Sequence, residues 1–197
     1  YHMARVAHWA HNGTVANYPT HTLLQLVIPP FSAYAILQTY ILSGSDRLAN
    51  LVQWNSLVAS LVGVSLAAEI LGGTRRAQLI AVLFAATLPM SILQASSTQN
   101  DLVATMWSAC TTVFALLLIT TGGRRWGLLC ALSLGLAAFT KGTALIISVP
   151  FLIWAFLKVR WGAGHKIAWL LLLIFTTAAL NAGFLQRLKE LHPDPFQ

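Results

Sequence analysis

Residues 77–120 read AQLIAVLFAATLPMSIL, QASSTQND and LVATMWSACTTVFALLLIT, which are two apolar runs on either side of a polar stretch at residues 94–101. Each apolar run approaches the ~20 residues that an α-helix needs to cross the hydrocarbon core of a bilayer. The polar stretch ends in Asp101, the only acidic residue between Glu69 and Glu190. A carboxylate beside a membrane span is costly, so Asp101 is interpreted first as a functional residue.

The composition of the whole chain indicates an integral membrane protein. Of its 197 residues, 57% are hydrophobic and 9% are charged, and the mean hydropathy is +0.70. A water-soluble domain carries roughly a quarter charged residues, so this chain has too few to cover a globule. The net charge of +7 does not indicate nucleic-acid binding, because the basic residues stand in short clusters between apolar runs. Cys110 and Cys130 lie within apolar runs and predict no disulfide.

The hydrophobic pattern predicts an all-α, polytopic membrane protein with about six transmembrane helices. Pro89 is expected to kink the second of these spans near its end. The fourth and fifth runs are short and need flanking residues to cross the bilayer. The predicted spans, in chain order, are residues 48–68, 77–93, 102–120, 126–139, 143–157 and 167–185.

The N-terminal part of the chain predicts an amphipathic loop with helices in the plane of the membrane. Residues 1–12 place apolar side chains on one helical face and polar ones on another, with Trp9 at the flank. Pro29-Pro30 stops any helix, and residues 31–42 are expected to form a second short helix on the membrane. The chain is therefore divided into an outer-face loop at 1–46, a transmembrane helical bundle at 47–185, and the start of a further outer-face loop at 186–197.

Lysine and arginine predict the orientation of the spans. Alternate loops carry the basic clusters Arg75/Arg76, Arg124/Arg125 and Lys158/Arg160/Lys166. By the positive-inside rule these loops face the cytoplasm. The N-terminal loop, residues 94–101 and Lys141 then share the outer side of the membrane, which makes them the candidate site.

Each charged residue on that side has two interpretations. Asp101 either caps the helix that follows or serves as an active-site carboxylate, and the two roles are compatible. Lys141 either extends toward lipid head groups, which the pattern alone favours, or binds a phosphate. Arg5 either contacts anionic lipid or grips a phosphate with its forked guanidinium group.

The sequence does not support a metal centre. His8 and His11 would share one face of a helix, with His2 and His21 nearby, but no cysteine or acidic residue completes a ligand set. Walker-type glycine loops, a Ser-His-Asp order and CxxC pairs are absent from the sequence. We predict no cofactor, with a divalent metal left open.

Several motifs resemble bacterial membrane glycosyltransferases of the GT-C superfamily, the family-39-like enzymes related to protein O-mannosyltransferases. The segment YHMARVAHW at residues 1–9, followed by Asn12-Gly13 and by NYPTH at residues 17–21, resembles their first outer loop. Residues 96–101 resemble their second outer loop, which bears a second acidic residue. FTKG at residues 139–142 is similar to a segment of the lipid A aminoarabinose transferases, and NAGF at residues 181–184 also matches relatives.

This resemblance implies sugar transfer from a polyprenyl-phosphate donor to a lipid, glycan or protein acceptor. The reaction would invert the anomeric carbon at the outer face of the bacterial inner membrane. Asp101 would be the second acidic, catalytic group. Arg5 and Lys141 would hold the donor phosphate, and Gln99 and Asn100 would line the cavity.

The resemblance also implies that part of the enzyme is missing. The principal catalytic carboxylate of the family precedes the segment that matches Tyr1, so we expect an N-terminal-half fragment that is inactive alone. The alternative is a polytopic transporter or lipid flippase with Asp101 and Lys141 lining its pathway, which interrupted spans would suit. The long first loop argues against that class. A non-catalytic scaffold would leave the cost of the polar stretch unexplained.

Overall fold

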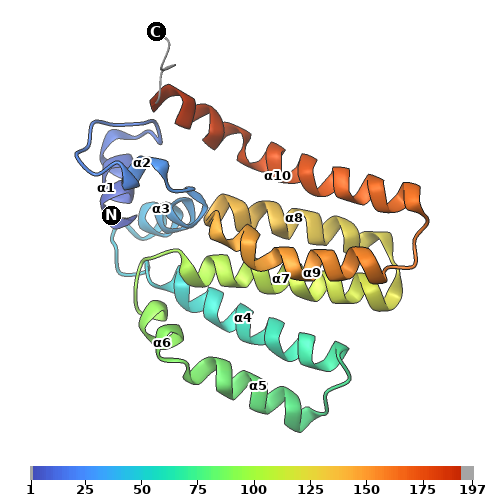
Figure 1. Cartoon of the computed structure of the whole chain (residues 1–197). Coiled ribbons are helices and arrows are strands. Elements are labelled where there is room, and N and C mark those ends of the chain that lie inside the picture. The colour runs from blue at the N-terminus through green and yellow to red at the C-terminus, as the bar shows by residue number, and fades with distance from the viewer. Residues whose placement is uncertain (1, 192–197) are drawn as a thin grey trace.

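The computed structural model describes residues 2–191, and within that range it contains helices, turns and loops but no strand (Figure 1). The predicted all-α fold is confirmed. Residues 192–197, part of the predicted second outer-face loop, lie outside the described residues. The helices in chain order are α1 (His2–Asn12), α2 (Leu24–Val27), α3 (Phe31–Ser43), α4 (Leu51–Ile70), α5 (Arg75–Thr87), α6 (Pro89–Ala95), α7 (Asp101–Thr121), α8 (Arg124–Thr140), α9 (Thr143–Lys158) and α10 (Ala163–Leu191).

Three of the described helices, α4, α7 and α10, are long and apolar enough to cross a membrane. The pair α5 and α6 makes a fourth span if it is counted as one, and its members meet at a bend of 64°. This bend begins at Pro89, where the sequence predicted a kink. Helices α8 and α9 are shorter, as their runs predicted, so this criterion gives fewer spans than the sequence did. Helix α10 continues through residues 186–191, which the sequence assigned to a loop.

The two ends of the helical bundle carry different chemistry. The loops between α4 and α5, α7 and α8, and α9 and α10 lie together at one end, opposite α1–α3 and α6 (Figure 1). We call the end that holds these three loops the basic end, because the loops contain the three predicted basic clusters. The opposite end, with α1–α3, residues 94–101 and Lys141, is the site end. The grouping that the loop charges predicted is therefore present in the fold.

Helix α7 is the centre of the bundle. Half of its apolar window (50%) is buried inside the described chain, compared with 17% for α4 and 28% for α10. Helices α4 and α7 approach closely at Gly63, where an added Cβ would lie 3.1 Å from the Cβ of Ala109. Helices α4 and α5 expose large apolar side chains such as Val62, Leu83 and Phe84, which is typical of a face in contact with lipid.

Helices α8 and α10 pack through small residues and interhelical hydrogen bonds. Trp169 donates to the carbonyl of Gly127 at 3.1 Å, and Asn181 donates to that of Gly135 at 3.2 Å. A Cβ on Gly135 would lie 2.7 Å from Leu180 Cδ1 and 3.3 Å from the carbonyl oxygen of Thr176. Small residues that allow close backbones, with polar side chains bridging them, are typical of helix pairs in membranes.

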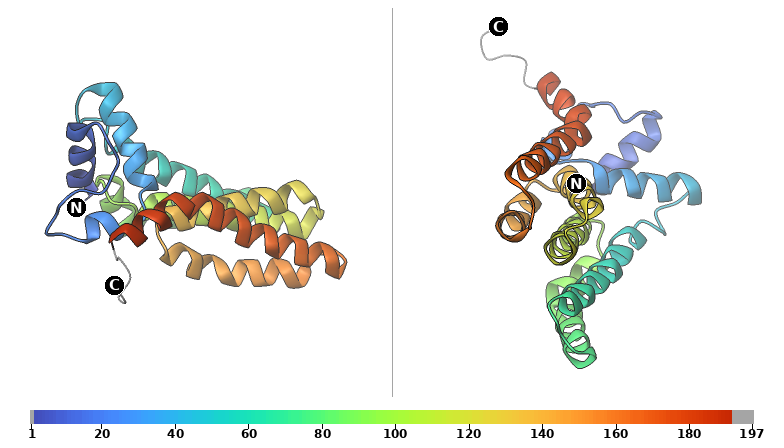
Figure 2. Two further views of the ribbon diagram at one scale, coloured as in Figure 1. Left: turned by 90° about the horizontal axis from the view of Figure 1, so that it is seen from above. Right: turned by 90° about the vertical axis from the view of Figure 1, so that its right-hand side faces the viewer.

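The site end is built by helices that run across the long ones, as Figure 2 shows in its left view. Helix α1 packs on α3 through a buried cluster that includes Val6, Trp9 and Ile36. Arg187 at the end of α10 donates to the carbonyl of Val15 at 2.9 Å and to the hydroxyl of Tyr34. The last described helix is therefore joined at this end to α3 and to the loop that follows α1.

We expect Gly135→Val to lower the free energy of unfolding by about 1–3 kcal/mol, because its side chain would push α10 away from α8. Gly183→Val is the matched control, since a Cβ at Gly183 has no neighbour within 4 Å. Thermal unfolding in detergent measures the difference. Equal unfolding temperatures for the two variants would contradict this account of the α8–α10 contact.

Candidate functional site

Asp101 and Lys141 form an ion pair at the site end. Asp101 is the first residue of α7 and Lys141 the residue that follows α8, and the Lys141 ammonium lies 2.5 Å from Asp101 Oδ1. Their side chains are 35% and 38% exposed, so the pair is open to a ligand. The pattern alone favoured extension of Lys141 to lipid head groups; in the structure its ammonium group is paired with Asp101.

The start of α7 is held by two buried amides rather than by a cap from Asp101. Asn100 takes the N-cap position, and its side chain donates to the carbonyl of Thr140 at 2.9 Å. From α4, Gln53 accepts the backbone N–H of Val103 at 3.2 Å. The carboxylate of Asp101 is directed to Lys141, so the cap interpretation of Asp101 is wrong. The sequence did not predict Gln53 as a site residue. The feature that could have indicated it is a side-chain amide within an apolar run.

Asn100 and Gln99, both predicted to line the cavity, lie in different environments. Asn100 is buried (2% exposed), and its bond to Thr140 fixes the backbone next to Lys141. Gln99 is exposed; its side chain accepts from Gln94 at 3.1 Å, and its carbonyl accepts from the Ser32 hydroxyl at 3.3 Å. Asn100 therefore positions the pair, while Gln99 links the polar stretch to α3.

Arg5 is buried at the site end, with 1% of its surface exposed. It donates to the carbonyl of Leu24 at 3.4 Å, and its guanidinium lies 5.5 Å from the ring centre of Trp9. This burial argues against contact with lipid head groups. A small pocket places Arg5 and Arg187 side by side in its lining, together with Phe184.

His2 lies within electrostatic reach of the ion pair, although the sequence singled it out only as a possible metal neighbour. Burial, reinforced by the Arg5 cation, lowers the pKa of His2 from its ordinary 6.5 to about 4, and Asp101 acts in the opposite direction. The imidazole is therefore neutral at physiological pH. Among residues 2–191, no three His, Cys, Asp or Glu side chains are grouped to hold a metal. His8 stacks on Tyr18, with ring centres 4.2 Å apart.

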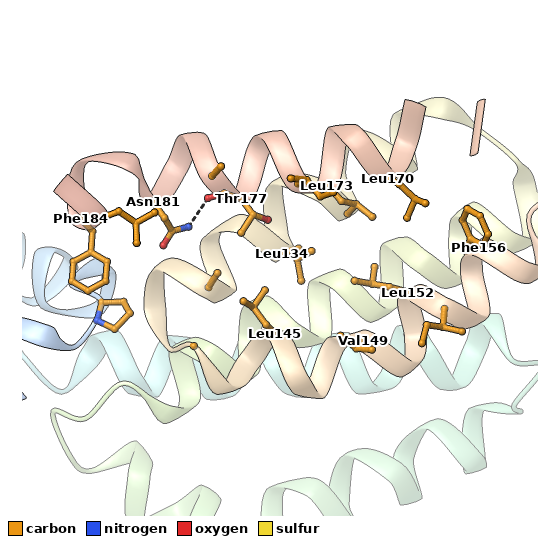
Figure 3. A pocket seen from close by; sticks show the side chains of 17 residues that line it. Leu134, Leu145, Val149, Leu152, Phe156, Leu170, Leu173, Thr177, Asn181 and Phe184 are labelled. Carbon is orange, nitrogen blue, oxygen red and sulfur yellow. Dashed lines mark hydrogen bonds between the residues drawn. The ribbon is translucent and has the colours of Figure 1, made fainter. Parts of the chain in front are cut away.

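An apolar groove of about 820 Å³ runs between α8, α9 and α10. Figure 3 shows Leu134, Leu145 and Leu173 directed into it from these three helices. Its lining includes Gly142, which follows Lys141, and Phe184, which also lines the Arg5–Arg187 pocket. The groove therefore extends from the apolar middle of the bundle to the site end. We call it the α9–α10 groove.

These features define an all-α membrane protein in which an apolar groove leads to charged groups at one end. The sequence model of the dolichyl-phosphate-mannose-protein mannosyltransferase family matches residues 27–182, which is most of the chain. The chain belongs to this family. It is accordingly a membrane glycosyltransferase of the GT-C type, as the motifs indicated. The match includes Asp101 and Lys141 and begins after Arg5. No curated protein and no solved structure matches the chain.

We expect Asn100→Ala to lower the free energy of unfolding by about 1–3 kcal/mol, because it removes a buried hydrogen bond and leaves the Thr140 carbonyl unpaired. Gln99→Ala, at an exposed neighbouring amide, should stay within ~0.5 kcal/mol of the unaltered protein. Chemical or thermal unfolding in detergent measures both. Similar losses for the two variants would rule out a positioning role for Asn100.

The low pKa of His2 predicts a loss of stability in acid. Between pH 6.5 and about 4 the unfolded chain binds a proton at His2 and the folded one does not, so folding weakens as the pH falls through this window. From pH 7 to pH 5, the unfolding temperature should therefore drop less in His2→Gln than in the unaltered protein. His11→Gln, at an exposed histidine of the same helix, should behave like the unaltered protein. An equal drop in all three would contradict the prediction.

Proposed function

We propose that this chain forms part of the site at which a sugar is transferred from a polyprenyl-phosphate donor to an acceptor hydroxyl, with inversion of the anomeric carbon. The observation that supports it most directly is the Asp101–Lys141 pair beside the site end of the α9–α10 groove. The basic end of the bundle would face the cytoplasm, which places this reaction at the outer face of the membrane.

The α9–α10 groove suits the donor's hydrocarbon chain. Its lining is almost entirely aliphatic and aromatic, and its volume of about 820 Å³ accommodates several isoprene units. At the site end the donor phosphate would meet Lys141, whose side chain is partly exposed. An ammonium group has three donor hydrogens, so Lys141 can bind Asp101 and still donate to a phosphate oxygen.

In the proposed reaction the acceptor oxygen attacks the anomeric carbon, and the bond to the phosphate oxygen breaks with its electron pair. The leaving phosphate gains negative charge in the transition state, which fixed cations stabilise. Asp101 would orient the acceptor hydroxyl and hold Lys141 in place. The proton of that hydroxyl would pass to a general base.

We expect Asp101→Asn in the full-length protein to lower sugar transfer by about 100-fold or more, because the acceptor and Lys141 lose their common anchor. The ion pair is more than a third exposed, so its loss should cost only ~0–1 kcal/mol of stability. Asp46→Asn, at an exposed loop carboxylate, is the matched control. The assay follows a radiolabelled sugar from polyprenyl phosphate to acceptor. Retained transfer would remove Asp101 from the site.

Lys141→Gln should raise the KM for the donor, because a cation that binds the phosphate is lost while the side chain stays polar. Lys158→Gln at the basic end is the matched control and should leave the donor KM unchanged. An unaltered donor KM in Lys141→Gln would contradict phosphate binding. Movement of the intact lipid across the membrane without sugar transfer would instead support the flippase alternative.

A further inference from the structure

A second cavity of about 770 Å³ opens between α3, α4 and α7 at the site end, and we call it the α3–α7 cleft. Aromatic rings form one part of its lining. Phe31 contacts Trp107 edge to face with ring centres 5.7 Å apart, and Phe139 lies 6.1 Å from both Phe31 and Tyr34. A wall of this kind offers apolar ring surface inside a cleft that also contains polar groups.

Three residues that line this cleft carry side-chain N–H groups that lack partners in the described chain. The Trp107 indole N–H is buried and bonds to nothing within residues 2–191. The side-chain amides of Gln38 and Asn55 line the cleft, are exposed, and have no hydrogen bond to any other described residue. Asn55 lies one turn inside the span α4. Unpaired amides at the edge of the hydrocarbon cost several kcal/mol, so an occupant that hydrogen-bonds to them is favoured.

The cleft differs from the donor side in its charge. None of its described lining residues is Lys, Arg, Asp or Glu, whereas Arg5, Arg187 and Lys141 stand at the site end of the α9–α10 groove. A lipid phosphate would therefore find no counter-ion in the α3–α7 cleft. A sugar ring fits it better, because its C–H face packs against aromatic rings and its hydroxyl rim hydrogen-bonds with amides and an indole N–H.

The two cavities lie on different sides of α8, next to the ion pair. Ala138 lines the α9–α10 groove, and the adjacent Phe139 lines the α3–α7 cleft. Val103, which follows Asp101 by two residues, also lines the cleft. An inverting transfer requires the acceptor and the leaving phosphate on opposite faces of the anomeric carbon. Ligands that approach Asp101 and Lys141 from these two cavities would meet that requirement.

We propose that the α3–α7 cleft binds the neutral sugar head group of a membrane glycolipid, and that this glycolipid is the acceptor. The binding site rests on the cleft alone, while the acceptor role rests on the proposed function. The lipid tails would lie along the exposed apolar face of α4, and the head group would lie between α3 and the first two turns of α7.

Native mass spectrometry of the full-length protein tests this with three probes of matched acyl chains. Monoglucosyl diacylglycerol should bind at least ~10-fold more tightly than diacylglycerol or phosphatidylglycerol, because the sugar makes two or more hydrogen bonds worth ~1 kcal/mol each. Asn55→Leu, Gln38→Leu and Trp107→Phe should each weaken its binding about 5-fold. Gln186→Leu, at an exposed amide outside the cleft, is the matched control and should bind like the unaltered protein.

Equal binding of monoglucosyl diacylglycerol and diacylglycerol would overturn the proposal. The proposal would also fail if Asn55→Leu lowered the unfolding temperature but left glycolipid binding unchanged. That result would mean that another segment of the protein, rather than a glycolipid, occupies the cleft. Binding of polyprenyl phosphomannose should stay within ~2-fold in the three variants; a greater loss would assign the cleft to the donor sugar instead. Selective glycolipid binding without any sugar transfer would support the binding site and contradict the proposed function. Failure of the binding site can therefore be distinguished from failure of the proposed function.

Discussion

The ion pair between Asp101 and Lys141 is the interaction on which the geometry of the site end depends. It joins the start of α7 to the end of α8 where both helices leave the apolar part of the bundle. Being partly exposed, it contributes little to stability by itself. The buried bond from Asn100 to the Thr140 carbonyl holds the two backbones in the register that brings the charges together. The buried amide of Asn100 therefore supports the partly exposed ion pair beside it.

Two cavities of different chemistry lie on either side of this pair. On one side of α8 an aliphatic groove ends near cations, and on the other an aromatic cleft with unpaired amides carries no charge. The α9–α10 groove suits a ligand that carries a phosphate, and the α3–α7 cleft suits a ligand with uncharged hydroxyl groups. Helices α1 and α3 complete the arrangement, because they run across the bundle and bring Arg5, Tyr34 and Phe31 over its end.

The sequence predicted much of the fold because hydrophobic length and charge are local properties. The span that became α7 matched its predicted bounds within one residue, and the break at Pro89 appeared where proline removes a backbone donor. Side-chain roles were harder to predict. Lys141 was interpreted from its position at a helix end, where extension to lipid head groups is common, and Asp101 from its position at a helix start. Neither position reveals the other residue, which lies across a contact between two helices.

By itself, the sequence determined the class of protein: an all-α membrane chain whose basic loops lie at one end and whose polar stretch lies at the other. Apolar runs must be helical in a bilayer, since every backbone group there needs an internal partner. Only the tertiary structure decided which residues come together at the candidate site. Packing brought Asp101 to Lys141, buried Asn100 as a support, and placed the Phe31, Trp107 and Phe139 rings around one cleft. These contacts join residues far apart in the chain, and periodicity along one helix carries no information about its neighbour.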